Sequence, residues 1–544
     1  MTPVTRLRAA VEAAVAALAD GATPRSQPTL ERPKQAGHGD YATNAALLLA
    51  PALGAPPREV AERLGGELRE RLGPALDRVE VAGPGFLNLF LADRWYVEAI
   101  DGVLDAGEQF GGGGADPVRN VNVEFVSTNP TGPMHVGHTR NAAYGDALAR
   151  LLAFRGHGVH REFYINDYGS QVRRFGESIQ ARARGDDPPP DGYRGEYVEE
   201  IARSIPGAAT ADVDQVARRG VELMVERMRE SLRRFRVEFD TWFSERSLHE
   251  AHPPEPSAVE HAFDVLAQQG RTYRHEGALW LRTTEFGDDK DRVLERSTGE
   301  HTYFASDIAY HQLKRERGYD LLIDVWGADH HGYIGRMHAA FEALGGAPDG
   351  LELLIMQLVH LVEGGRRASM SKRRGEFVSI DELIDEIGVD AARWYLLARS
   401  HETTIEVDLD LAREQSSENP VYYVQYAHAR IKSVLRKAGD ERVALALERP
   451  PGPVELEEPE RALVKKLLAF PDEVAEAADR RAVHRIAAYA LELAQTFTAF
   501  YRDCLVVGAE PQAVEDNRLR LCVATGRTIA KALDLLGVAA PDEM

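Results

Sequence analysis

The spacing of apolar residues in the first hundred positions predicts a small α/β domain. Between positions 4 and 18, apolar residues recur at helical spacing among charged ones, which is typical of an amphipathic helix and unlike the unbroken apolar centre of a signal peptide. Two further helices are expected at 41–49 and 58–72, and a strand at 86–91. Positions 111–114 are all glycine, so this freely rotating run is expected to mark a domain boundary.

From residue 121 onward, the pattern changes to strands that alternate with helices. A strand candidate at 121–126 precedes a turn rich in proline and glycine at 127–133, and a helix is expected at 136–155. Further strands are expected to begin at residue 162 and to span 320–326. The order strand, turn, helix, strand is typical of a doubly wound parallel sheet, so we expect an α/β fold with a Rossmann-type catalytic domain.

These patterns divide the chain into four regions. An α/β N-terminal domain is expected at 1–110, and the Rossmann-type domain at 115–378. Within the latter, the mixed and charged helical segment at about 168–300 is interpreted as an insertion. A helical connection follows at 379–409, beginning at a serine that can cap a helix. The last domain, at 410–544, is predicted to be all-α because helical periodicity continues to its end.

Composition and charge narrow the class of protein. With 44% hydrophobic and 28% charged residues, and no apolar run near the ~20 residues needed to cross a bilayer, the chain is expected to be a cytoplasmic protein without a membrane partner. Its two cysteines, Cys504 and Cys522, lie too far apart in sequence for a metal-ligand cluster, so no zinc is expected. The net charge of -21 argues mildly against a nucleic-acid partner. A basic groove on an acidic body nevertheless stays compatible with it, since binding depends on the local field.

The segment 134–138, Met-His-Val-Gly-His, is the first candidate for chemistry. It lies at a strand-to-helix junction, where unpaired backbone N–H groups and a partial positive charge suit the phosphates of ATP. His135 and His138 could add hydrogen-bond donors, and Gly137 lets a nucleotide approach the backbone. For an isolated motif of this kind, a pair of surface or capping histidines is the commoner explanation.

The segment 369–373, Ser-Met-Ser-Lys-Arg, is the second candidate and follows a hairpin expected at Gly364–Gly365. A lysine on a mobile loop, here Lys372, can hold the β- and γ-phosphates while negative charge builds up in the transition state. Taken alone, a solvated basic loop would be the preferred interpretation.

Together and in this order, the two segments resemble the signature motifs of class I aminoacyl-tRNA synthetases, written HIGH and KMSKS. The second departs from that pattern at Ser369 and Arg373, which leaves Lys372 as the better candidate. The resemblance implies catalytic roles for His135, His138 and Lys372. It also implies ATP contacts for Gly137, Gly327, Asp329, Met370 and Ser371.

Four longer segments, at 124–138, 303–307, 326–331 and 419–430, are similar to arginyl-tRNA synthetases. Planar carboxylates suit a guanidinium buried away from water, although an exposed strand acid and a helix-surface acid are the ordinary alternatives. In that family the positions matching Glu124, Asn129, Tyr303 and Asp307 line the arginine pocket, and by register His330 is expected beside them.

Segments in the N-terminal and C-terminal parts of the chain resemble the same family. Segments 39–45 and 85–89 are similar to the family's N-terminal domain, which touches the elbow of tRNA. Segment 390–393, Asp-Ala-Ala-Arg, resembles the DALR signature of a helical anticodon-binding domain, and 540–544 resembles the family's tail. The implied activity is ATP-dependent attachment of L-arginine to tRNA(Arg) through an arginyl-adenylate, by a monomer that takes ATP with its Mg²⁺ as substrate.

Single features of the sequence argue against other functions. Glutaminyl and glutamyl enzymes share the motifs, but carboxylates facing the substrate would repel a glutamate. A cysteine enzyme would need a zinc held largely by cysteines, and the insertion is too short for the large editing domain of valine, isoleucine and leucine enzymes. A small-molecule adenylyltransferase would need neither terminal domain. A noncatalytic RNA-binding relative should have lost His135, His138 or Lys372, and all three are present.

Overall fold

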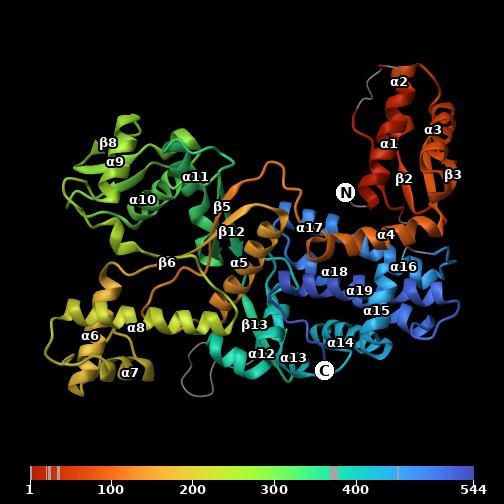
Figure 1. Ribbon diagram of the computed structural model, residues 1–544. Coiled ribbons are helices and arrows are strands. Elements are labelled where there is room, and N and C mark those ends of the chain that lie inside the picture. Colours follow the sequence, from red (N-terminus) through yellow and green to blue (C-terminus); the bar gives the residue numbers. More distant parts are fainter. Residues whose placement is uncertain (1–2, 20, 22–25, 34–36, 368–377, 450–451) are drawn as a thin grey trace.

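The computed structural model describes residues 3–19, 21, 26–33, 37–367, 378–449 and 452–544 (Figure 1). The N-terminal unit lies beside the C-terminal helices, with the parallel sheet next to them and two further groups of elements on the far side of that sheet (Figure 1). Among the described residues, no helix has both the length and the apolar character needed to cross a membrane.

The N-terminal unit packs three helices against a four-stranded antiparallel sheet of order β1-β2-β4-β3. The elements are α1 (Pro3–Ala19), β1 (Leu30–Glu31), β2 (Tyr41–Thr43), α2 (Ala45–Leu53), α3 (Pro57–Leu72), β3 (Leu76–Ala82) and β4 (Phe86–Leu91). The helix expected at 41–49 is wrong in its first turn, because Tyr41 and Thr43 are buried at strand spacing and β2 pairs with β4. Asp40 fixes this pairing, since its carboxylate accepts a hydrogen bond from the Leu91 amide at 2.7 Å.

A helix and a short glycine segment lead from this unit to the parallel sheet. The helix is α4 (Asp93–Ala106). The predicted boundary at Gly111–Gly114 is tightly packed, because a Cβ on Gly111 would lie 2.6 Å from the Phe470 ring and one on Gly112 2.7 Å from the Phe154 ring. Glycine is therefore required here by close approach as well as by backbone freedom.

The catalytic unit is built on five parallel strands in the order β12-β11-β5-β6-β7. They are β5 (Asn120–Glu124), β6 (Gly158–Ile165), β7 (Thr241–Ser244), β11 (Leu321–Gly327) and β12 (Leu351–Met356). The predicted doubly wound α/β class is confirmed. The chain runs outward from β5 to β7 on one side and from β11 to β12 on the other, so the order reverses between β5 and β11.

Helix α5 (Val136–Arg155) connects β5 to β6 and has the bounds that the sequence predicted. It is buried on most of its circumference, which explains its weak amphipathic pattern. Gly145 lets the helix touch the sheet directly, since a Cβ there would lie 2.1 Å from the Phe125 ring. The helix ends at Gly156, which adopts a left-handed conformation with φ 101°.

The segment interpreted as an insertion at about 168–300 contains one strand of the parallel sheet, β7. Helices α6 (Ser170–Arg184), α7 (Glu196–Ser204) and α8 (Val213–Arg234) precede that strand. The short 3₁₀ helix η3 (Glu245–Leu248), α9 (Ala258–Gln268) and an antiparallel sheet of β8 (Thr272–His275), β9 (Ala278–Leu281) and β10 (Arg292–Glu295) follow it. Helix α10 (Tyr303–Glu316) then leads back to β11.

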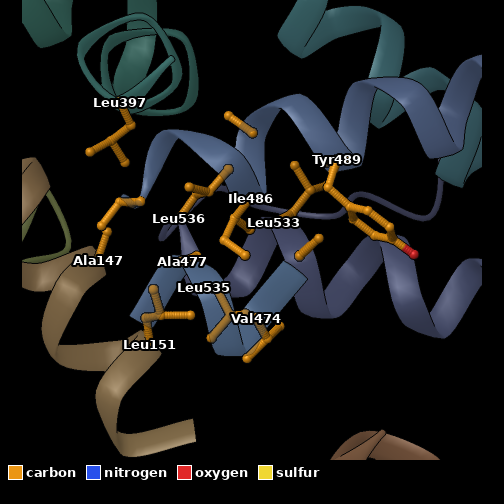
Figure 2. Close-up of a cluster of buried hydrophobic side chains, with 14 of the residues drawn as sticks. Ala147, Leu151, Leu397, Val474, Ala477, Ile486, Tyr489, Leu533, Leu535 and Leu536 are labelled. Carbon is orange, nitrogen blue, oxygen red and sulfur yellow. The ribbon is translucent and has the colours of Figure 1, made fainter. Parts of the chain in front are cut away.

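After residue 379 the chain is mainly helical, as predicted, with the short strand β15 (Ile405–Asp408) as an exception among the described residues. After β11 come the 3₁₀ helix η5 (Ala328–Tyr333), α11 (Ile334–Ala343), and a small sheet of β13 (Val359–Glu363), β14 (Arg366–Arg367) and β15. The helices are α12 (Ile380–Leu397), α13 (Leu409–Arg413), α14 (Pro420–Ala438), α15 (Asp440–Glu448), α16 (Glu458–Leu467), α17 (Phe470–Asp479), α18 (His484–Asp503) and α19 (Gln512–Leu535). Apolar residues of α5, α12, α17, α18 and the end of α19 form one core, so α5 packs directly on the C-terminal helices (Figure 2).

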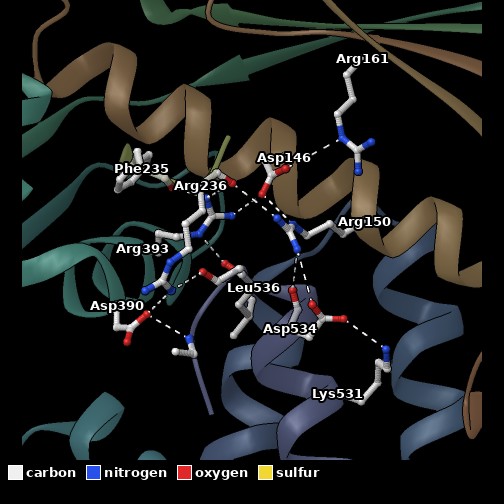
Figure 3. A network of polar contacts seen from close by, with 12 residues as sticks. Asp146, Arg150, Arg161, Phe235, Arg236, Asp390, Arg393, Lys531, Asp534 and Leu536 are labelled. Carbon is white, nitrogen blue, oxygen red and sulfur yellow. Dashed lines mark hydrogen bonds and ion pairs between the residues drawn. The ribbon is translucent and has the colours of Figure 1, made fainter. Parts of the chain in front are cut away.

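A buried polar joint holds α5, α12 and the end of α19 together (Figure 3). The Arg393 guanidinium, which is fully buried, donates to Asp146 of α5 at 2.5 Å, to the Leu536 carbonyl at 2.8 Å and to the Phe235 carbonyl at 3.0 Å. Gly537 must lack a side chain, because a Cβ there would lie 2.3 Å from the guanidinium. The arginine of the DALR-like segment is therefore a structural residue that satisfies groups from three parts of the chain.

Candidate active site

The site lies at the carboxyl ends of β5 and β11, where the strand order reverses. In open parallel sheets this reversal leaves a crevice in which ligands bind. Glu124 ends β5, and Gly327 ends β11 and begins η5. Residues about 200 positions apart in sequence thus come together at one edge of the sheet, as the predicted site requires. Asp329 lies in η5, and a Cβ on Gly327 would approach its carboxylate to 2.6 Å.

His135 and His138 cap the start of α5 reciprocally. The Nδ1 atom of His135 accepts from the Gly137 amide at 3.1 Å, and Nδ1 of His138 accepts from the His135 amide at 3.2 Å. Their rings stack with centroids 3.9 Å apart. Since Nδ1 is the acceptor in both, each neutral ring carries its proton on Nε2. The capping role weighed as an alternative is therefore present, and it fixes which nitrogen can donate to a ligand.

Both imidazoles are neutral at physiological pH. Burial lowers the pKa of His135, and burial together with the neighbouring His135 lowers the pKa of His138 to about 3. The Nε2 of His138 lies 3.2 Å from the hydroxyl of Thr128 in the turn after β5. The pair can thus supply neutral hydrogen-bond donors at a helix start, in addition to the partial positive charge of the helix itself.

Chain segments more than 200 residues apart meet beside His135. The Val136 amide donates to the Val378 carbonyl at 2.9 Å, and the Ile380 amide donates to the Met134 carbonyl at 3.1 Å. Ser379 caps α12 in a capping box with Glu382, as predicted. The second signature lies immediately upstream, and its residues Ser369, Met370, Ser371, Lys372 and Arg373 fall outside the described residues.

The hairpin expected before the second signature is present. β13 and β14 pair antiparallel, and Gly364 and Gly365 turn between them with φ values of 56° and 72°. Two consecutive positive φ values form the tight turn that glycine favours.

A cavity of about 440 Å³ is lined by Ser127 and Asn129 of the turn after β5, and Thr128 between them contacts His138 of α5. All five residues predicted to contact arginine line it, namely Glu124, Asn129, Tyr303, Asp307 and His330. Tyr303 is the most open of them, with 72% of its surface exposed. The Asn129 amide donates to Gln171 at 2.8 Å, and His330 packs near Trp326, with ring centroids 5.7 Å apart.

Two carboxyl groups of this cavity, Asp307 and Glu245, form no ion pair in the part of the chain that the structure describes, although the charges of His311 and His330 lower the pKa of Asp307 to a smaller extent than burial raises it. Asp307 accepts from the Tyr333 hydroxyl at 2.5 Å, and its burial raises its pKa. Glu245, in η3, is buried, and its pKa is raised to about 8 by that burial and by repulsion from Asp307. A ligand cation would therefore stabilise the ionised form of both carboxyl groups and offset the repulsion between them.

Glu124 is in a different electrostatic state, although it lines the same cavity. One of its carboxylate oxygens accepts from the Lys314 ammonium at 2.5 Å and the other from the Ser127 hydroxyl at 2.8 Å. Lys314 is fully buried and also pairs with Asp324 at 2.8 Å. Glu124 is thus already paired with a cation of the protein. This pairing makes it a weaker counter-ion for a ligand than Asp307 or Glu245.

Comparison with known proteins gives the same assignment along the whole chain. Residues 5–91 match the arginyl tRNA synthetase N terminal domain, residues 100–182 and 199–432 the catalytic domain of class I (R) tRNA synthetases, and residues 424–544 the DALR anticodon binding domain. The chain belongs to the arginyl-tRNA synthetase family. The arginine–tRNA ligase of Geobacillus kaustophilus is 44% identical over 534 residues, which cover 95% of this chain and 94% of that protein. That of Oceanobacillus iheyensis is 42% identical over 529 residues, with the same coverage.

A solved structure extends this likeness to three dimensions. The arginyl-tRNA synthetase of Thermus thermophilus superposes with a TM-score of 0.76 at 25% sequence identity, covering 99% of this chain and 100% of that one. The arrangement of N-terminal, catalytic and helical C-terminal units is thus that of an arginyl-tRNA synthetase.

Of the cavity residues that the sequence did not single out, Glu245 and Tyr333 bear most directly on its charge. Glu245 directly follows β7, which was interpreted as part of an insertion, so the acid was not placed at a strand end. A usable signal was the aromatic run Trp242–Phe243, which a buried strand explains better than a helix surface. Tyr333 follows the Trp326–His331 segment by two residues and had no distinguishing pattern.

A second cluster of ligand-type side chains is held together by an arginine. Glu457, Glu460 and Cys504 lie within reach of one another. The Arg518 guanidinium, however, donates to Glu457 at 2.6 Å and to Glu460 at 3.2 Å, and burial raises the pKa of Cys504 to about 11. The cluster is therefore an internal salt-bridge group with a protonated thiol.

Proposed function

We propose that this member of the arginyl-tRNA synthetase family joins L-arginine to tRNA(Arg) in two steps, through an arginyl-adenylate. The observation that carries the proposal is the cavity at the carboxyl ends of β5 and β11, where Asp307 and Glu245 form no ion pair with any described residue. Thr128, in the turn that lines this cavity, contacts His138 at the start of α5. A guanidinium and a triphosphate are the ligand groups that these two halves would recognise.

Arginine recognition is divided among the residues of the cavity. Asp307 and Glu245 take the guanidinium, because they gain most from a cation. Glu124, held by Lys314 and Ser127, is left to orient the α-amino end of the substrate as a hydrogen-bond acceptor. Tyr303, Asn129 and His330 complete the walls.

In the first step an oxygen of the arginine carboxylate attacks the α-phosphorus of ATP, and pyrophosphate leaves. The Nε2–H groups of His135 and His138 donate to the transferring phosphate, while Lys372 with Met370 and Ser371 holds the β- and γ-phosphates. Gly137, Gly327 and Asp329 contact the rest of the nucleotide, which brings its own Mg²⁺. This chemistry depends on positioning and electrostatics, so neutral histidine donors suffice. In the second step the 2′-hydroxyl of the terminal adenosine of tRNA takes the arginyl group from the adenylate.

The backbone pairing beside His135 supports the role of Lys372. Val378 is hydrogen-bonded to Val136, and Lys372 lies six residues before it in sequence. Six residues of chain reach at most about 20 Å. Chain connectivity therefore limits Lys372 to about 20 Å from Val378.

We assign the tRNA contacts to the terminal regions. The N-terminal domain, about 1–110, contacts the elbow of tRNA, and the helical domain, about 410–544, binds the anticodon. The connection at 379–409 joins that domain to the catalytic unit at 115–378, with its insertion at about 168–300. We propose that the protein works as a cytoplasmic monomer and that adenylate formation needs bound tRNA.

Aminoacylation of bulk tRNA, with each of the twenty amino acids offered in turn, tests the proposal. Arginine alone is expected to be attached. Attachment of glutamate or glutamine instead would refute the assignment of the cavity. Arginine-dependent exchange of pyrophosphate into ATP at full rate without tRNA would refute the requirement for tRNA.

A further inference from the structure

The turn after β5 has a strained backbone. Val126 and Ser127 have φ values of 71° and 26°, and among the described residues they are the only two consecutive non-glycine residues with positive φ. A β-branched residue such as Val126 rarely adopts this conformation, because its side chain collides with the backbone. Such strain persists only where neighbouring groups hold the chain in place, and it is concentrated at functional sites.

This turn forms the wall shared by the two halves of the site. Ser127 lines the arginine cavity and donates its hydroxyl hydrogen to Glu124 at 2.8 Å. The next residue, Thr128, places its hydroxyl 3.2 Å from Nε2 of His138. The Tyr164 amide of β6 donates to the Ser127 oxygen at 3.1 Å. A change in this turn would therefore move contacts on the arginine side and on the ATP side together.

One buried side chain holds the turn from α5. The Asn141 oxygen accepts from the Val126 amide at 2.9 Å, and its amide nitrogen donates to the Val325 carbonyl of β11 at 2.9 Å. Asn141 is only 6% exposed and lies one helical turn after His138. Asn141 thus connects α5 to the turn after β5 and to the end of β11.

We propose that Asn141 is a positioning residue for the activation step, which keeps Val126 and Ser127 in the left-handed conformation and so orients Glu124 and His138. It does not touch substrate. An alanine at 141 removes the acceptor for the Val126 amide, so the turn relaxes towards an ordinary conformation. Both the binding of arginine and the transfer of the adenylyl group then suffer.

A double-mutant cycle with Val126→Gly tests this role, because glycine adopts positive φ without a steric penalty. In the wild-type background Asn141→Ala is expected to lower kcat/KM for arginine in tRNA-dependent pyrophosphate exchange by about 100-fold, through both a higher KM and a lower kcat. In the Val126→Gly background the same change is expected to cost less than about 10-fold. The KM for tRNA is expected to stay within about twofold in all variants.

Asn122→Ala is the matched control. Asn122 is also buried and lies on β5, and its side chain donates to the Glu162 carboxylate at 2.8 Å instead of to the backbone of the turn. Its effect is expected to be the same in both backgrounds. An additive cycle for Asn141→Ala in an active wild-type protein would overturn the proposal, as would an Asn141→Ala chain that is insoluble in both backgrounds. A chain that is insoluble alone but active with Val126→Gly supports it. The proposal rests on the proposed function, and a wild-type protein that attaches no arginine would overturn both.

Discussion

Arginine affinity is predicted to rise with pH, because Glu245 must lose a proton before it can pair with a guanidinium. Burial and the neighbouring Asp307 raise the pKa of Glu245 to about 8 in the free protein, so at pH 7 most of these side chains are protonated. The guanidinium keeps its charge throughout. Since binding favours the carboxylate, the Kd for arginine falls as pH rises through the pKa of Glu245 and levels off above it.

The size of the effect follows from the ionised fraction of Glu245. With a pKa of about 8, that fraction is about 3% at pH 6.5 and about 76% at pH 8.5. The Kd for arginine should therefore fall about 25-fold over this range. Near pH 7, binding of one arginine should release almost one proton.

Calorimetry of L-arginine binding to the free protein at several pH values is the direct assay. Proton release appears as a dependence of the measured heat on the ionisation enthalpy of the buffer. Glu245→Gln, which mimics the protonated side chain, should bind arginine more weakly than the wild type at every pH in this range and show a nearly flat profile. The variant also corrects for titration of the amino acid itself. Equal pH slopes for the two proteins would refute the reasoning.

Three further changes test other parts of the structure. Asp307→Asn keeps the shape of the cavity but removes a charge. It should raise the arginine KM in aminoacylation by about 30-fold or more, because breaking a buried charged hydrogen bond costs about 2–5 kcal/mol. An unchanged KM would exclude contact between Asp307 and the guanidinium. Lys372→Ala should lower the kcat of activation far more than it raises the arginine KM, and the opposite split would remove Lys372 from the transition state. Asp146→Asn leaves the buried Arg393 without a counter-ion and should destabilise the protein by about 3–5 kcal/mol in denaturant unfolding; an unchanged midpoint would contradict the importance of the joint.

Much of the catalytic unit could be predicted because local and long-range preferences agree there. Helix α5 has the predicted bounds, since a capping segment precedes it and Gly156 ends it. The hairpin at Gly364–Gly365 followed from turn chemistry. The family and the α/β fold class are also confirmed. The five predicted arginine residues line one cavity, while their individual roles stay predictions.

Features that depend on contacts between distant segments of the chain could not be predicted from the sequence. Tyr41–Thr43 reads as part of a helix until β4 is available to pair with it. Lys314 looks like a surface residue of an amphipathic helix, and only the fold reveals that it neutralises Glu124 and Asp324. Glu245 lines the cavity because it follows β7, a strand of the parallel sheet that lies within the segment interpreted as an insertion. In each case the deciding interaction joins segments that no local pattern connects.

The polar joint around Arg393 also constrains how this protein can be made. Its acceptor at Leu536 lies 143 residues further along the chain, and ribosomes add about 5–20 residues per second. For about 7–30 s after Arg393 is polymerised, its Nε–H group has to stay hydrated or find a temporary partner, because the Leu536 carbonyl to which it will donate does not yet exist. The nascent catalytic unit therefore cannot reach its final packing until translation has passed the end of α19.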